Sequence, residues 1–117
     1  PVEILRVPTL REEDGLAISS RNRYLSRQER EIAPLLYRTL TETADYLKAH
    51  PFNVDNALSL AAYTLSHHGF ASVDYVELRH ANTLEPLAVL NAPARLLAAV
   101  HLGTTRLIDN VAVDTGS

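Results

Sequence analysis

Residues 95–110 read RLLAAVHLGTTRLIDN, and this stretch predicts the centre of the fold. Two runs rich in aliphatic and β-branched residues, 95–102 and 105–110, flank a short connection at Gly103 and Thr104. Two such runs joined by a short glycine-containing connection are typical of a β-hairpin. A third run of this kind, residues 73–79, comes earlier in the chain. We therefore expect a small antiparallel sheet of about three strands.

A first helix is expected upstream of the sheet, beginning at Ser26. Ser26 and Glu29 have the Ser-x-x-Glu spacing of a capping box, and apolar residues three and four apart follow them to about residue 50. Pro34 must kink this helix or restart it, because proline lacks a backbone donor and clashes with the preceding turn.

A second helix is expected from about Val54 to His68, with Asn53 as its N-cap and Gly69 as its end. Both helices have one apolar face, and a small sheet also needs to bury one face. The sequence therefore predicts an α+β fold, in which a small antiparallel sheet of about three strands packs against two helices.

The composition excludes several classes of protein. The chain has 117 residues, of which 46% are hydrophobic, and this is the length of one domain with its own core. It has no cysteine, which excludes disulfides and thiolate metal sites. A net charge of −3 argues against a nucleic-acid surface. No apolar run reaches the roughly 18 residues of a membrane span, so we expect a soluble cytoplasmic protein without membrane contact.

The stretch GLAISSRNRYLS, residues 15–26, gathers polar donors just before the first helix. Ser19 and Ser20 can approach phosphoryl oxygens closely, and Arg21 offers a planar bidentate fork. These residue types fit a loop that grips a polyphosphate. Turn and cap chemistry is the more common explanation of such a connection, so the residues by themselves leave both interpretations open.

As a string, this stretch resembles the signature of the pantothenate synthetase (pantoate–beta-alanine ligase) family. VPTLREEDGLAISSRNRYLS at 7–26, VDYVELR at 73–79 and HLGTTRLIDN at 101–110 follow the second half of that family in order. The family's His-x-Gly-His motif does not occur in this chain, and Lys48 is its only lysine. The resemblance implies a C-terminal lid domain at 11–117, preceded at 1–10 by the end of a nucleotide-binding domain.

The resemblance also implies a function in pantothenate and coenzyme A biosynthesis. The family's full-length enzyme is an AMP-forming ligase: pantoate attacks ATP, pyrophosphate leaves, and beta-alanine displaces AMP from pantoyl adenylate. This domain would bind ATP and close over it, and would be inactive alone. The residues that match the family's ATP contacts are Leu10, Ile18, Ser19, Ser20 and Arg21. Arg21 would stabilise the leaving pyrophosphate, and no residue of this chain would act as acid or base.

The expected partners follow from the same resemblance. ATP would be a substrate, accompanied by Mg²⁺, with no tightly bound cofactor and no metal site on this chain. Pantoate and beta-alanine would bind to the full-length enzyme, a homodimer whose N-terminal nucleotide-binding domain is missing here. Two alternatives remain open: a stand-alone nucleotide- or anion-binding module, and an interaction domain in which the serine and arginine loop only caps a helix.

Other polar residues have simpler structural explanations. Arg30 is expected to be solvated and paired with Glu29 or Glu31, and the acidic run 12–14 is expected to be a solvated linker. Asp109 is expected to hold a strand end through side-chain to backbone hydrogen bonds, without a catalytic role.

Overall fold

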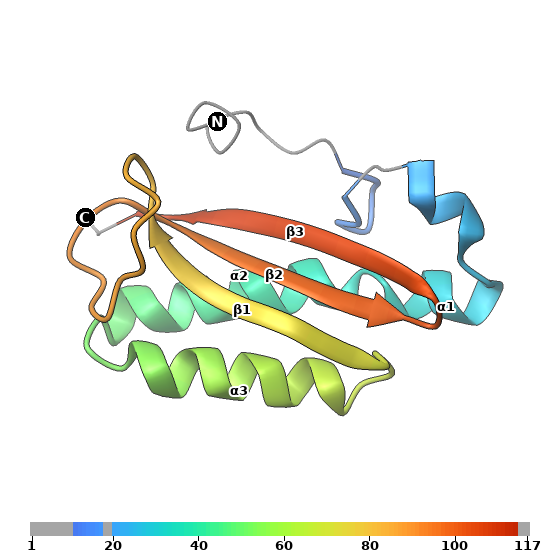
Figure 1. The fold of residues 1–117 in the computed structure, drawn as a ribbon, viewed down its shortest axis with the longest axis horizontal. Helices are drawn as coiled ribbons and strands as arrows, with labels where there is room; N and C mark the ends of the chain where they lie inside the picture. Colours follow the sequence, from blue (N-terminus) through green and yellow to red (C-terminus); the bar gives the residue numbers. More distant parts are fainter. Residues whose placement is uncertain (1–10, 18–19, 115–117) are drawn as a thin grey trace.

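A computed structural model describes residues 11–17 and 20–114 of the chain (Figure 1). A short 3₁₀ helix, η2, is followed by three α-helices and three strands. Their bounds are η2 Ser20–Tyr24, α1 Arg27–Ile32, α2 Leu35–Ala49, α3 Val54–Ser66, β1 Ser72–His80, β2 Ala94–Leu102 and β3 Thr105–Val113.

The three strands form one antiparallel sheet in the order β1-β2-β3. β2 and β3 are the predicted hairpin: Leu102 pairs with Thr105, and Gly103 takes a φ of 61° in the connection. Each strand has nine residues, so all three extend beyond the predicted runs. A bulge between Val73 and Tyr75 interrupts the pairing of β1 with β2.

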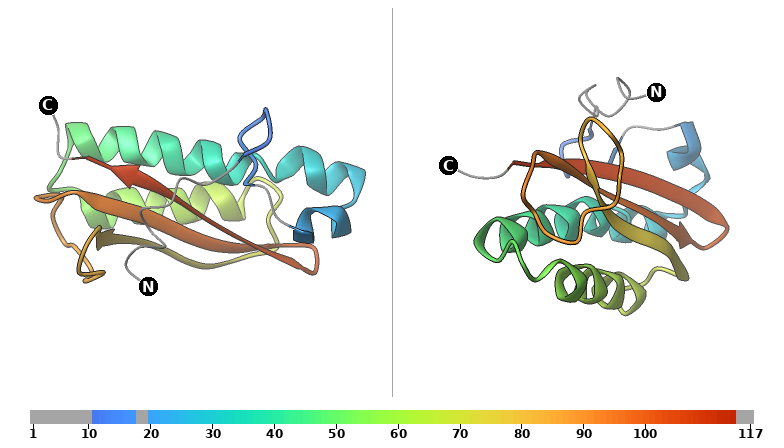
Figure 2. Two further views of the ribbon diagram at one scale, coloured as in Figure 1. Left: turned by 90° about the horizontal axis from the view of Figure 1, so that it is seen from above. Right: turned by 60° about the vertical axis from the view of Figure 1, so that its left-hand side comes forward.

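The long helices α2 and α3 lie side by side on one face of the sheet (Figures 1 and 2). Alternate residues of β2 point toward them, and the core forms between the two layers. Fully or almost fully buried side chains of this core include Leu40, Leu47, Leu65, Leu78, Leu96, Val100 and Leu102. The predicted α+β fold is confirmed.

Helix boundaries confirm two sequence signals and correct a third. Pro34 separates α1 from α2, and the capping box forms as expected, since the Glu29 amide donates to Ser26 Oγ at 3.1 Å and the Ser26 amide donates to Glu29 Oε1 at 2.9 Å. Asn53 occupies the N-cap of α3 but makes no side-chain capping bond; its Nδ2 lies 3.4 Å from the Tyr46 hydroxyl instead.

The chain after α3 turns through Gly69, three residues beyond the end of the helix. The helix stops at Ser66, two residues before the predicted end, and Gly69 takes a φ of 108°. A side chain there would be strained by this φ and would press on Ile32. No helix within 11–17 and 20–114 is long and apolar enough to cross a membrane.

Candidate functional site

Residues 11–17 form a compact turn ahead of η2, hereafter the 11–17 turn. Arg11 and Ala17 pair as an antiparallel bridge, the Glu12 amide donates to the Leu16 carbonyl at 2.8 Å, and the Gly15 amide donates to the Glu12 carbonyl at 3.0 Å. Gly15 has a φ of 94°, a backbone conformation that is energetically unfavourable for residues other than glycine. The turn therefore brings its first and last residues together.

The Arg11 guanidinium attaches the 11–17 turn to the body of the domain. It donates to both oxygens of Asp109, from Nη1 at 2.6 Å and from Nη2 at 2.9 Å. Nη1 also donates to the Gly15 carbonyl at 3.0 Å, and Nη2 to the Asn110 carbonyl at 3.1 Å. The guanidinium carbon lies 3.8 Å from the centroid of the Tyr37 ring. The turn, β3 and α2 thus meet at one side chain.

Asp109 lies in the middle of β3, where it pairs with Ala98, and not at a strand end as expected. Its Oδ1 accepts from the Asn110 amide at 2.7 Å, as expected, but its main partner is Arg11, which lies 98 residues away in the sequence. The Asp109 side chain is only 2% exposed and that of Arg11 17% exposed. A buried carboxylate needs a charged or hydrogen-bonded partner, and Arg11 supplies it.

A second ion pair links the same turn to α1. Arg30 donates to Asp14, from Nη1 to Oδ2 at 2.7 Å and from Nη2 to Oδ1 at 3.2 Å. The expectation that Arg30 pairs with Glu29 or Glu31 is wrong: Glu29 closes the capping box, which leaves the guanidinium to face the turn. The acidic run 12–14 is therefore tied to α1 at Asp14, although it is exposed.

Arg30 shifts the titration of Asp14. Its hydrogen bonds and charge hold the pKa of the Asp14 carboxyl below the ordinary value of 3.8, because they favour the ionised form. A depressed pKa in the folded state stabilises the fold above the unfolded pKa, and this contribution is lost as pH falls through the folded pKa. Because the pair is exposed to solvent, the contribution is small.

Replacing Arg30 by glutamine is expected to raise the pKa of Asp14 toward its ordinary value, measured by NMR titration of the side-chain carboxyl. Asp74 is the control, since its pKa is lowered mainly by Arg106, which Arg30→Gln does not touch. A titration of Asp14 that is the same in both proteins would mean that the pair seen here does not persist in solution.

Asn22 links the two sides of the segment that contains the serine and arginine residues. Its Nδ2 donates to the Ala17 carbonyl at 3.0 Å, so two described residues that flank residues 18–21 in the sequence are bonded to each other. Its Oδ1 is buried, and no described residue donates to it.

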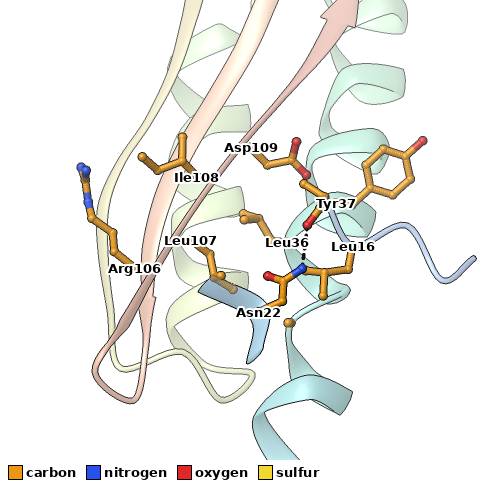
Figure 3. A pocket seen from close by; sticks show the side chains of 10 residues that line it. Leu16, Asn22, Leu36, Tyr37, Arg106, Leu107, Ile108 and Asp109 are labelled. Carbon is orange, nitrogen blue, oxygen red and sulfur yellow. Dashed lines mark hydrogen bonds between the residues drawn. The ribbon is translucent and has the colours of Figure 1, made fainter. Parts of the chain in front are cut away.

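A pocket of about 160 Å³ lies beside this junction (Figure 3). Leu16 and Asn22 line it together with residues of α2 and β3. Tyr37 and Asp109, both partners of Arg11, are among them, so the pocket and the attachment of the turn share residues.

Only two of the five predicted ATP contacts lie within the described residues. Leu10, Ile18 and Ser19 lie outside the described residues, and the backbones of Ser20 and Arg21 form the first residues of η2. Their roles toward ATP stay predictions. No group of three or more histidine, aspartate or glutamate side chains that could hold a metal ion occurs within 11–17 and 20–114.

Sequence reasoning missed Arg11, Asp14 and Asn22 as residues that shape the loop. Arg11 and Asp14 stand in a segment interpreted as linker, and no spacing rule links Arg11 to Asp109. Asn22 does stand inside the quoted signature, between two arginines, and its position there was the one available signal.

Comparison with known proteins identifies the family of this chain. Residues 1–112 match the family model described as pantoate-beta-alanine ligase. A pantothenate synthetase of Paramagnetospirillum magneticum is 52% identical over 114 residues, which are 97% of this chain and 40% of that protein. The chain thus spans about 40% of the length of such relatives and corresponds to their C-terminal part.

Solved structures agree in fold. The crystal structure of pantothenate synthetase from Thermus thermophilus has a TM-score of 0.79 and 42% identity, over 92% of this chain and 39% of that one. Pantoate-beta-alanine ligase from Francisella tularensis, solved in complex with beta-gamma ATP and beta-alanine, has a TM-score of 0.56 and 28% identity, over 90% of this chain and 31% of that one.

Proposed function

The chain belongs to the pantoate-beta-alanine ligase family, and on that basis we propose that it is the C-terminal, ATP-binding domain of a pantothenate synthetase. In the full-length enzyme the pantoate carboxylate attacks the α-phosphorus of ATP and pyrophosphate leaves. The amine of beta-alanine then attacks pantoyl adenylate, and AMP leaves as the amide forms. In the first step, negative charge develops on the leaving pyrophosphate, and positioned hydrogen-bond donors lower the energy of this transition state.

The observation that carries this proposal is the bond between Ala17 and Asn22, which flank residues 18–21 in the sequence. The Asn22 side chain donates to the Ala17 carbonyl, and the 11–17 turn is held by Arg11 and by the ion pair of Asp14 with Arg30. A loop whose ends are fixed can present hydroxyl and guanidinium donors in a set geometry, which lowers the entropy lost on binding phosphate. In this proposal Ser19, Ser20 and Arg21 bind the triphosphate, while Leu10 and Ile18 lie on the adenine side.

The rest of the active site lies outside this domain in our proposal. Residues 1–10 end a preceding nucleotide-binding domain, residues 11–117 form the lid, and pantoate and beta-alanine bind mainly to the preceding domain. Mg²⁺ arrives with ATP, since phosphate oxygens are its preferred ligands. The full-length enzyme is a cytoplasmic homodimer, and no tightly bound cofactor takes part.

The isolated chain is expected to fold and yet to form no pantothenate from pantoate, beta-alanine and ATP. Its core supports folding, but the pockets for the other two substrates belong to the preceding domain in this proposal. The measurement compares pantothenate, AMP and pyrophosphate formed by the isolated chain and by the full-length protein, with circular dichroism of the chain as a control for folding. Turnover by highly purified chain, or no turnover by the full-length protein, would contradict the proposal.

A further inference from the structure

We propose that Arg11 is a positioning residue for ATP: it fixes the 11–17 turn so that the segments on both sides of it meet the nucleotide together. This inference rests on the function proposed above. It concerns a residue that makes no contact with ATP in that proposal and acts through the backbone of its neighbours.

The contacts of Arg11 account for its fixed geometry. The guanidinium donates to two carboxylate oxygens of Asp109 and to the carbonyls of Gly15 and Asn110, and its central carbon lies over the Tyr37 ring. A planar fork with five donors can satisfy all these partners at once, whereas a lysine ammonium is a point charge that cannot. The turn is thus set in position and orientation against both β3 and α2.

The place of Arg11 in the chain connects this geometry to ATP. Leu10, the proposed adenine-side residue, is its neighbour in the sequence, and Ala17, its bridge partner, directly precedes residues 18–21. A shift of the turn would therefore move both proposed contact segments. A misplacement of about 1 Å far from the reacting atoms can cost on the order of 10² in rate.

The close approach of the turn to α2 shows how little room it has to shift. A Cβ added to Gly15 would collide with the Tyr37 ring, the same ring that lies under Arg11. Gly15 and Arg11 therefore both pack against the Tyr37 ring of α2. Apolar side chains can often replace a buried ion pair without loss of folding stability. The contribution that we assign to the pair of Arg11 and Asp109 is therefore the orientation of the 11–17 turn.

The test compares Arg11→Lys with the parent in the full-length ligase. Lysine keeps a charge for Asp109 but loses the fork and the ring contact. We expect kcat/KM for ATP in pantoate-dependent pyrophosphate exchange to fall roughly 10- to 100-fold, with KM for pantoate within about twofold of the parent. Arg11→Lys with kcat/KM for ATP within about threefold of the parent would overturn the inference.

A matched control separates positioning from stability. Val113→Ala removes a fully buried side chain at the end of β3, where it pairs with Ala94, and so lowers the melting temperature without altering the 11–17 turn. Its kinetic constants are expected within about twofold of the parent when assayed well below the melting temperature. An equal fall in kcat/KM for ATP in both variants would mean that Arg11 only stabilises the fold.

Hydrogen exchange of the full-length protein gives a readout independent of activity. In Arg11→Lys the amides of 11–17 should exchange faster, while those of β2 keep their protection. A parent without pyrophosphate-exchange activity would overturn the proposed function, whereas an active parent with unchanged hydrogen exchange at 11–17 in Arg11→Lys would overturn the positioning role alone.

Discussion

Arg21→Ala in the full-length ligase is expected to slow pantoate-dependent exchange of labelled pyrophosphate into ATP by about 10²- to 10³-fold, with little effect on folding. In our proposal the guanidinium meets the β- or γ-phosphate, where its charge offsets the negative charge that builds on pyrophosphate as it leaves. Loss of one preorganised donor to a developing anion costs about 3 to 4 kcal/mol. Arg21→Lys should recover only part of the rate, because a point charge cannot replace the bidentate fork.

Arg38→Ala is the control for this variant. The Arg38 side chain is 72% exposed on α2 and pairs with Glu42 one turn along, so its loss should leave the exchange rate within about twofold of the parent. Thermal melting of each variant checks that folding is intact. An exchange rate for Arg21→Ala within about threefold of the parent would make Arg21 a structural residue, and the phosphate-binding role of the loop would have to be abandoned.

Asp109→Ala is expected to lower the free energy of unfolding of the isolated chain by about 3 kcal/mol, or its melting temperature by roughly 10 °C. The substitution leaves the Arg11 guanidinium largely buried without its carboxylate, and an uncompensated buried charge is costly. Asp109→Asn should cost less, because its side-chain carbonyl can still accept one hydrogen bond. Urea unfolding and thermal melting measure both.

Glu42→Ala provides the comparison for Asp109→Ala. It removes the carboxylate of an exposed pair whose side chains are 72% and 68% exposed, and should change the free energy of unfolding by less than about 1 kcal/mol. If Asp109→Ala were no more destabilising than Glu42→Ala, the pair with Arg11 would not be formed in solution.

Local signals predicted most of the fold. The capping box joins Ser26 and Glu29, which lie only three residues apart in the sequence. Gly103 lies between two strands that are adjacent in the sequence and pair with each other. Pro34 acts through its own ring, whatever surrounds it. At Asn53 the predicted N-cap position is confirmed, but the capping bond is not formed, and the side-chain amide lies against the Tyr46 hydroxyl. Strand lengths were underestimated: pairing with β2 extends β1 to the polar residues Ser72 and His80, and β3 continues through the apolar residues 111–113.

The shape of the candidate site could not be predicted in the same way. Arg11 meets Asp109 and Asp14 meets Arg30 only because the folded sheet and helices bring distant segments together. The residues expected to touch phosphate came from the string at 15–26, whereas the residues that hold this string in place carried no pattern. In a single sequence, a buried arginine and a solvated one look alike.

Within 11–17 and 20–114, β1 and β3 are the outer strands of the sheet, and the edges of sheets are templates on which other chains can add a strand. β1 is interrupted by its bulge between Val73 and Tyr75, which disturbs a regular ladder. On β3, the Asn110 carbonyl already accepts from Arg11. If the 11–17 turn detached from β3, the Asn110 carbonyl would become available to another strand. We therefore expect self-association to begin from molecules with a detached turn.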